Sequence, residues 1–66
     1  MTNLKNNRIA YGVTQKELAE RSGVNVRIIQ HYEQGFRDIN KAEAMTVYKL
    51  SEALGCSVKD ILEFEV

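Results

Sequence analysis

Apolar residues recur at helical spacing along most of this 66-residue chain, and short polar stretches with glycine, serine, threonine or asparagine separate them. Such spacing predicts amphipathic helices that each bury one face. The first helix is expected over about residues 3–11, with Leu4, Arg8 and Tyr11 on one face and Gly12 at its end. Asn7 lies on that same side, so its amide needs either a buried polar partner or access to solvent.

Residues 14–35 predict two short helices joined by a tight turn. Thr14 and Glu17 have the spacing of a capping box, in which each side chain accepts a hydrogen bond from the other's backbone amide. Gly23 allows the positive backbone angle that ends this helix. Asn25 is then placed to cap a further helix that begins at Val26.

Each of these two helices has one apolar face. Leu18, Ala19 and Ser22 face inward from the first, and Ile29 and Tyr32 face inward from the second. The other side of the second helix is largely polar and has no evident role in a core. Its first two turns expose residues suited to reading base edges: Asn25, Val26, Arg27, Gln30 and His31. This pattern predicts a helix-turn-helix that binds DNA.

The second half of the chain is expected to complete the core with two more helices. Asn40 and Glu43 have capping-box spacing, which predicts a helix over residues 41–54 that buries Ala44, Val47, Leu50 and Leu54. Ser57 and Asp60 repeat that spacing. A short last helix is therefore expected, with Val58, Ile61 and Leu62 facing the core.

The last residues, L-E-F-E-V, alternate apolar and acidic side chains and are compatible with a short C-terminal strand. A lone strand leaves its backbone groups without partners. Pairing with the same segment of a second protomer, through Leu62, Phe64 and Val66, would supply them. Packing of the tail onto the last helix is the alternative.

The length and composition count against catalysis. Residues 1–66 are expected to form one domain, which leaves little room for an enclosed substrate pocket. The single His31 and single Cys56 are too few for a metal site, and there is no glycine-rich phosphate loop. We therefore expect no catalytic residues, no metal and no cofactor. Cys56 is expected to fill the core as a small apolar group, with redox sensing as the weaker alternative.

The N-terminus lacks the apolar core of a signal peptide, and no run approaches the roughly 20 apolar residues that span a bilayer. This pattern favours a cytoplasmic protein with no membrane partner. Nine basic and nine acidic side chains give zero formal charge, which counts against DNA binding by charge alone. The bases are concentrated in residues 1–40, so affinity per protomer is expected to be modest and two protomers are expected on one site.

Residues of this pattern also stand at positions that are shared with one family. They are Arg8, Gly12, Thr14, Gln15, Leu18, Ala19, Gly23, Ile29, Glu33, Gly35 and the run L-S-E-A-L-G-C-S-V-K-D-I-L at 50–62. Together, at this spacing, they resemble the lambda-repressor-like family of phage repressors, Cro proteins and XRE-type regulators over nearly the whole chain. The resemblance implies an all-α fold, a compact five-helix DNA-binding domain with the helix-turn-helix at its second and third helices.

The resemblance implies roles for individual residues as well. Arg8 and Glu33 match a structural ion pair between the first helix and the end of the third. The recognition helix, at about residues 26–33, would enter the major groove. Base contacts are then implied for Val26, Arg27, Gln30 and His31, and phosphate contacts for Gln15, Asn25, Gln34, Arg37 and Lys41.

Two positions on this surface leave alternatives open. His31 is equally compatible with a surface position that contacts no base, and Ile28, apolar on this side, is expected to meet a base methyl or the DNA backbone. The segment after Gly35 is longer than is usual in the family and has no proline, which makes the role of Lys41 less secure than that of Arg37.

The expected function is a sequence-specific transcriptional regulator of double-stranded DNA, with repression as the expected mode. It would bind a pseudopalindromic operator as a homodimer, and no small-molecule ligand is evident. The alternative belongs to another class, an antitoxin or partner-binding module that uses the same fold. Zero net charge and the apolar tail motivate that alternative.

Overall fold

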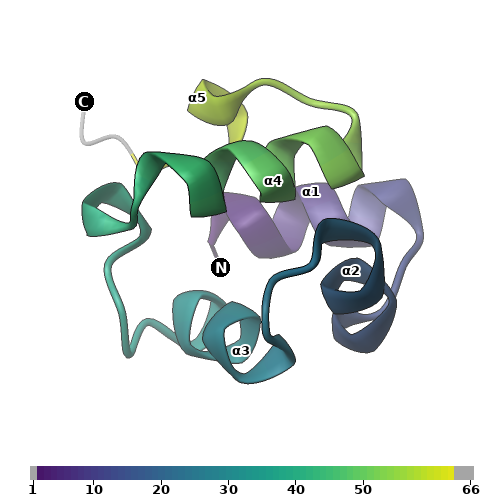
Figure 1. Cartoon of the computed structure of the whole chain (residues 1–66), viewed down its shortest axis with the longest axis horizontal. Helices are drawn as coiled ribbons and strands as arrows, with labels where there is room; N and C mark the ends of the chain where they lie inside the picture. Colours follow the sequence, from purple (N-terminus) through teal and green to yellow (C-terminus); the bar gives the residue numbers. More distant parts are fainter. Residues whose placement is uncertain (1, 64–66) are drawn as a thin grey trace.

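The computed structural model describes residues 2–63, which form an all-α fold (Figure 1). In chain order the elements are α1 (Asn3–Tyr11), α2 (Gln15–Ser22), α3 (Val26–Gln34), the 3-10 turn η1 (Ile39–Lys41), α4 (Ala44–Leu54) and α5 (Val58–Ile61). In Figure 1, α4 crosses the middle with α1 behind it, α2 and α3 lie below, and α5 lies above. The predicted fold class is confirmed for these residues. The C-terminal strand was predicted mainly on residues 64–66, which lie outside the described range.

The core draws one fully buried side chain from each α-helix. These are Leu4, Leu18, Ile29, Leu50 and Ile61, each with 0% exposure. Burying such a side chain stabilises a fold by about 1.5–3 kcal/mol. Tyr32 and Val47 extend the same cluster at 7% and 4% exposure. Because all five helices meet in one cluster, the orientation of α3 depends on the packing of the whole domain.

The predicted helix ends between α2 and α3 are confirmed. The Thr14 hydroxyl accepts a hydrogen bond from the Glu17 amide at 3.0 Å, and the Glu17 carboxylate accepts one from the Thr14 amide at 3.0 Å. Gly23 ends α2 with φ +75°, a conformation that costs glycine little. The Asn25 side chain accepts a hydrogen bond from the Arg27 amide at 2.8 Å and so caps α3. These local bonds position the start of α3 relative to α2.

Acid is expected to weaken the capping boxes of α2 and α5. Hydrogen bonds from the Thr14 amide and hydroxyl lower the pKa of Glu17, and those from the Ser57 hydroxyl and amide lower the pKa of Asp60. A carboxylate with a lowered native pKa contributes stability above its unfolded pKa and loses it as the pH falls through the native pKa. Thermal unfolding followed by circular dichroism from pH 7 to pH 2 should therefore show a smaller acid-induced fall in Tm for Glu17→Gln/Asp60→Asn than for wild type.

The matched control for this prediction is Glu20→Gln, on the same helix as Glu17 but outside its capping box. It should follow the wild-type pH profile. Equal acid sensitivity of wild type and the double variant would contradict a role for the two boxes.

The predicted start of α4 is wrong. The helix begins at Ala44 rather than Lys41, and Glu43 precedes it without a side-chain cap. Residues 39–41 form η1 instead, capped by the Asp38 carboxylate, which accepts a hydrogen bond from the Asn40 amide at 2.9 Å. Burial of Ile39 at 4% exposure anchors this turn, and the extended backbone of Ala42 separates it from α4. Ala44 is consequently exposed rather than buried, whereas Val47, Leu50 and Leu54 are buried as predicted.

Polar contacts join α5 and the residues after it to α1. The Asn7 side-chain amide donates to the Asn3 carbonyl at 2.9 Å and to the Asp60 carbonyl at 3.0 Å, so it finds partners within the fold. The Asn3 side chain donates to the Leu62 carbonyl at 2.8 Å. The Asn40 amide group both donates to and accepts from the backbone of Glu63, which brings η1 to the same end of the molecule.

The structure also shows how closely four further side chains, those of Cys56, Val58, Leu62 and Ile28, pack against the core. Cys56 is half-buried and packs against the core, and burial, followed by the charge of Asp60, raises the pKa of its thiol. Val58 is exposed at 36%, whereas Leu62 packs against the core. Ile28 is half-buried, packs against the core and lines the groove beside α3, so its predicted contact with DNA stays a prediction. Its place on the edge of the apolar face of α3 explains the apolar residue at this position.

Candidate functional site

Helix α3 buries one face and presents the other to solvent. Ile29 and Tyr32 lie in the core, whereas Arg27 is exposed. Three further candidate residues, Val26, Gln30 and His31, are half-buried on the helix. Arg27 and His31 are four residues apart and therefore lie on one side of the helix. Among the described residues, this side of α3 brings a guanidinium, an amide and an imidazole together on a convex element that can enter a groove.

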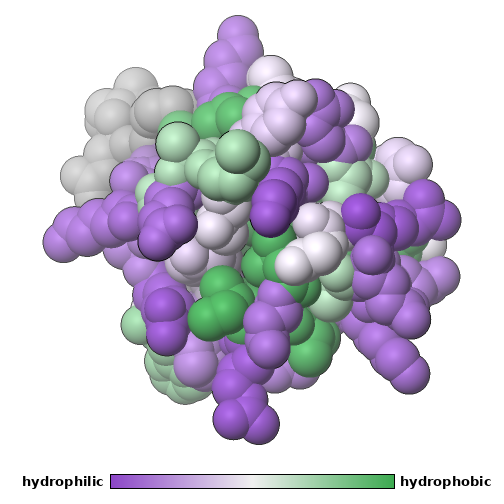
Figure 2. Space-filling view, viewed as in Figure 1, coloured by the Kyte–Doolittle hydropathy of each residue, from purple (hydrophilic) through white to green (hydrophobic). Residues whose placement is uncertain are grey.

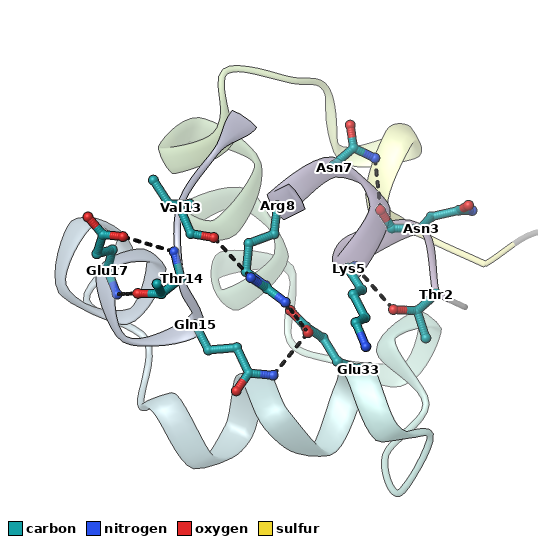
Figure 3. Close-up of polar contacts among 10 residues, drawn as sticks. All are labelled: Thr2, Asn3, Lys5, Asn7, Arg8, Val13, Thr14, Gln15, Glu17 and Glu33. Atoms are coloured by element: carbon teal, nitrogen blue, oxygen red, sulfur yellow. Dashed lines mark hydrogen bonds and ion pairs between the residues drawn. The ribbon is translucent and has the colours of Figure 1, made fainter. Parts of the chain in front are cut away.

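A single carboxylate connects the start of α2 to α1 and α3 (Figure 3). Glu33 at the end of α3 accepts from Arg8 Nε at 2.7 Å and from Arg8 Nη2 at 3.0 Å, with side-chain exposures of 2% for Glu33 and 12% for Arg8. The remaining Arg8 nitrogen, Nη1, donates to the Val13 carbonyl at 2.9 Å. The pair is thus bidentate and nearly dry, a geometry that orients the elements it joins.

Gln15, the first residue of α2, completes this network. Its Nε2 donates to Glu33 Oε1 at 3.0 Å (Figure 3). The spacing of residues along the chain carried no signal for this bond, because the two residues are 18 positions apart. The bond leaves the second Nε2 proton of Gln15 and the first backbone amides of α2 for an outside partner. The N-terminus of α2 is therefore tied to the C-terminal end of α3.

The C-terminal end of α3 carries a second small cluster. Arg37 Nε donates to His31 Nδ1 at 3.4 Å. The ring of Phe36 meets the imidazole of His31 edge to face, with centroids 5.9 Å apart and planes at 72°. His31 thus contacts both residues that follow Gly35, and these contacts orient its ring.

A groove of about 580 Å³ runs beside α3 and is lined by three basic residues and by the acidic residues Asp38 and Glu43. Arg37 and Lys41, both predicted as phosphate contacts, line it together with Lys49 of α4. Figure 2 shows apolar residues between α3 and α4 in the middle of this face, with hydrophilic side chains around them. Lys49 was not among the predicted contacts, because no local motif in the sequence marks it. Two other predicted phosphate contacts lie at the ends of α3: Gln34 is exposed at its C-terminal end, and Asn25 caps its N-terminal end.

Lys41 therefore lies close enough to α3 to share a groove with Arg37, although η1 replaces the predicted helix start. Leu62, one of the three residues predicted to contact a second protomer, packs partly on the core, and the other two lie outside residues 2–63.

On the side of the molecule that includes α1 and α2, the Arg21 guanidinium lies over the ring of Tyr11, 5.7 Å from its centroid. This contact was not apparent from the sequence.

Within residues 2–63, no helix has the length and apolar character needed to cross a membrane. The same residues bring together no group of three or more histidine, cysteine, aspartate or glutamate side chains that could hold a metal ion.

Comparison with known proteins gives one match. A family model described as helix-turn-helix matches residues 4–61. Neither the curated proteins nor the solved structures gave a match.

Proposed function

Because the chain belongs to the lambda-repressor-like helix-turn-helix family of DNA-binding regulators, we propose that it recognises one duplex sequence as a homodimer and represses transcription there. The proposed operator is pseudopalindromic, and the proposed site of action is the cytoplasm. The single observation that carries this proposal is that α3 buries Ile29 and Tyr32 on one face and leaves Arg27 exposed on the other.

In this proposal α3 lies in the major groove and its exposed side chains read base edges. Arg27, at the second position of the helix, is exposed and can donate two hydrogen bonds to guanine O6 and N7. Val26, Gln30 and His31 are the other proposed base contacts. Because His31 Nδ1 accepts a hydrogen bond from Arg37, Nε2 is the ring nitrogen that we propose to reach DNA.

The proposed phosphate contacts flank α3 on both sides. Gln15 and the first amides of α2 would meet one phosphate, since a helix N-terminus favours an anion. Asn25, Gln34, Arg37 and Lys41 would meet others, and Lys49 joins them because it lines the same groove as Arg37 and Lys41.

The proposed dimer contact lies near the C-terminus, next to the groove beside α3, since Ala42 lines both grooves. An apolar groove there is lined by Ile39, Asn40, Ala42, Ala44, Val47, Tyr48, Val58 and Leu62. The backbone of Glu63 is bonded to Asn40, which lines this groove, and Phe64 and Val66 follow Glu63 in the sequence. The proposed occupant is the matching surface of a second protomer, with Leu62, Phe64 and Val66 as contacts. Binding of two protomers to one operator would compensate for the modest affinity that follows from the low charge of each protomer.

Selection of bound duplexes from a randomised pool at near-physiological salt tests this function. We expect enrichment of an inverted repeat, with half-sites about 34–36 Å apart if both recognition helices face the same side of the duplex. The apparent association constant should fall steeply as salt rises, because each phosphate contact releases counterions. Failure to enrich any sequence would contradict an autonomous regulator.

One observation favours the second candidate, a partner-binding or antitoxin module. Met45 and Tyr48, on the exposed side of α4, remain 59% and 52% exposed beside the apolar groove. A protein contact through this surface would respond weakly to salt, unlike DNA binding. The salt dependence of whichever complex forms therefore separates the two candidates.

A further inference from the structure

Phe36 is the most exposed large apolar side chain among residues 2–63, at 75%. It takes no part in the core cluster and does not line the apolar groove near the C-terminus. The other strongly exposed apolar side chains of the second half, Met45 and Tyr48, lie on α4 next to that groove. Phe36 therefore belongs to a different surface.

The position of Phe36 is fixed by the end of α3. Gly35 adopts φ +83°, and the Phe36 amide then donates to the His31 carbonyl at 2.9 Å. This is the Schellman arrangement, in which the residue after the glycine commonly packs against the helix. Here the packing is the edge-to-face contact with His31, and it leaves three-quarters of the side chain in water. The ring is thus held in place without being buried.

The ring lies on the DNA-facing side of the molecule in the proposed function. It contacts His31, which follows Arg27 by one helical turn. Its neighbour Arg37 is bonded to the same imidazole. Exposed apolar residues are common singly, but this one is oriented by a proposed base-contacting residue and stands between two proposed phosphate contacts, Gln34 and Arg37.

We propose that Phe36 is a specificity-determining residue that makes an apolar contact with a thymine 5-methyl group at the edge of each half-site. The proposal rests on the proposed function, since it requires α3 in the major groove. Among the four bases, only thymine presents a methyl group there, and phenylalanine is one of the side chains suited to meet it. The contact would add sequence preference without adding charge, which suits a protein with zero formal charge.

Replacement of single thymines by uracil in the selected operator tests this contact, because uracil lacks only the methyl group. For wild type, one position in each half-site should show about a fourfold loss of affinity, the worth of one buried methyl group. Phe36→Ala should bind the thymine operator about fourfold or more weakly per half-site and should no longer distinguish thymine from uracil at that position. Thermal unfolding should be unchanged, because the side chain is 75% exposed.

Two control variants separate this contact from other effects. Ile9→Ala, which removes an exposed apolar side chain on α1, should keep both the affinity and the thymine preference. Arg27→Ala should lose affinity but keep the thymine preference at the Phe36 position. An equal loss for thymine and uracil operators in Phe36→Ala would overturn the methyl contact and indicate deoxyribose instead, and no loss would overturn any DNA contact. Failure of wild type to select DNA would instead refute the proposed function itself.

Discussion

Replacing Glu33 with alanine is expected to remove about 3–5 kcal/mol of folding free energy, the cost of leaving one member of a buried ion pair without its partner. Arg8, only 12% exposed, would keep its charge, and Gln15 would lose the acceptor of its side-chain amide. Native domains of this size are stabilised by roughly 3–10 kcal/mol, so the loss is a large share of the total. Urea unfolding at pH 7 should show a lower midpoint with an unchanged slope.

Two controls make the Glu33 result specific. Glu20→Ala removes an exposed carboxylate from α2 and should change stability by no more than about 0.5 kcal/mol. Arg8→Met combined with Glu33→Leu should recover most of the loss, because replacing both buried charges with apolar side chains is often neutral. A Glu33→Ala midpoint equal to that of Glu20→Ala would show that the network does not stabilise the fold.

Replacing Arg27 with alanine should leave the fold intact and weaken operator binding by about 1–3 kcal/mol per half-site, or roughly twice that for the proposed dimer on both half-sites. The side chain is exposed, so its loss leaves no cavity. A parallel selection with wild type and Arg27→Ala should show one guanine position relaxed in each half-site. Fluorescence anisotropy on the selected operator gives the affinity change.

Arg21→Ala is the matched control, since it removes a guanidinium that lies over Tyr11 rather than on α3. Its binding should change much less than that of Arg27→Ala. A uniform loss over all sequences in Arg27→Ala, with a smaller salt slope and no relaxed position, would mean that Arg27 meets a phosphate instead of a base.

Local chemistry explains which parts of the fold the sequence could predict. The ends of α2 and the start of α3 depend on Thr14, Glu17, Gly23 and Asn25, whose bonds reach no further than four residues along the chain. Capping and positive φ are encoded at this range, so these boundaries were predicted correctly. The inward face of α3 followed from helical periodicity for the same reason.

The start of α4 shows where such reasoning fails. Asn40 and Glu43 have capping-box spacing, but the Asn40 side chain bonds instead to the backbone of Glu63, 23 residues away. Burial of Ile39 and capping by Asp38 stabilise η1 ahead of the helix. The bond between Asn40 and Glu63 is the tertiary contact that overrode the local signal of Asn40 and Glu43, and no pattern within a few residues could reveal it.

The candidate site divides in the same way. The exposed side of α3 was predictable from periodicity. The bond from Gln15 to Glu33 arises only when separate segments meet, whereas the contacts of His31 with Phe36 and Arg37 form across the turn at Gly35. The sequence marked Arg8 and Glu33 through family resemblance alone, and the geometry adds that Gln15 shares their carboxylate.

The shared Glu33 carboxylate has a mechanical consequence for the proposed complex. With α1, the start of α2 and the end of α3 bonded to one nearly dry side chain, the gap between the phosphate-binding and base-reading elements is set before DNA arrives. Because this spacing is fixed, the protein cannot adapt to a duplex of a different groove width. The duplex must instead bend or twist to fit the protein. Stiffness of base pairs that neither protomer touches would then enter the affinity, and the operator would be chosen partly for its flexibility.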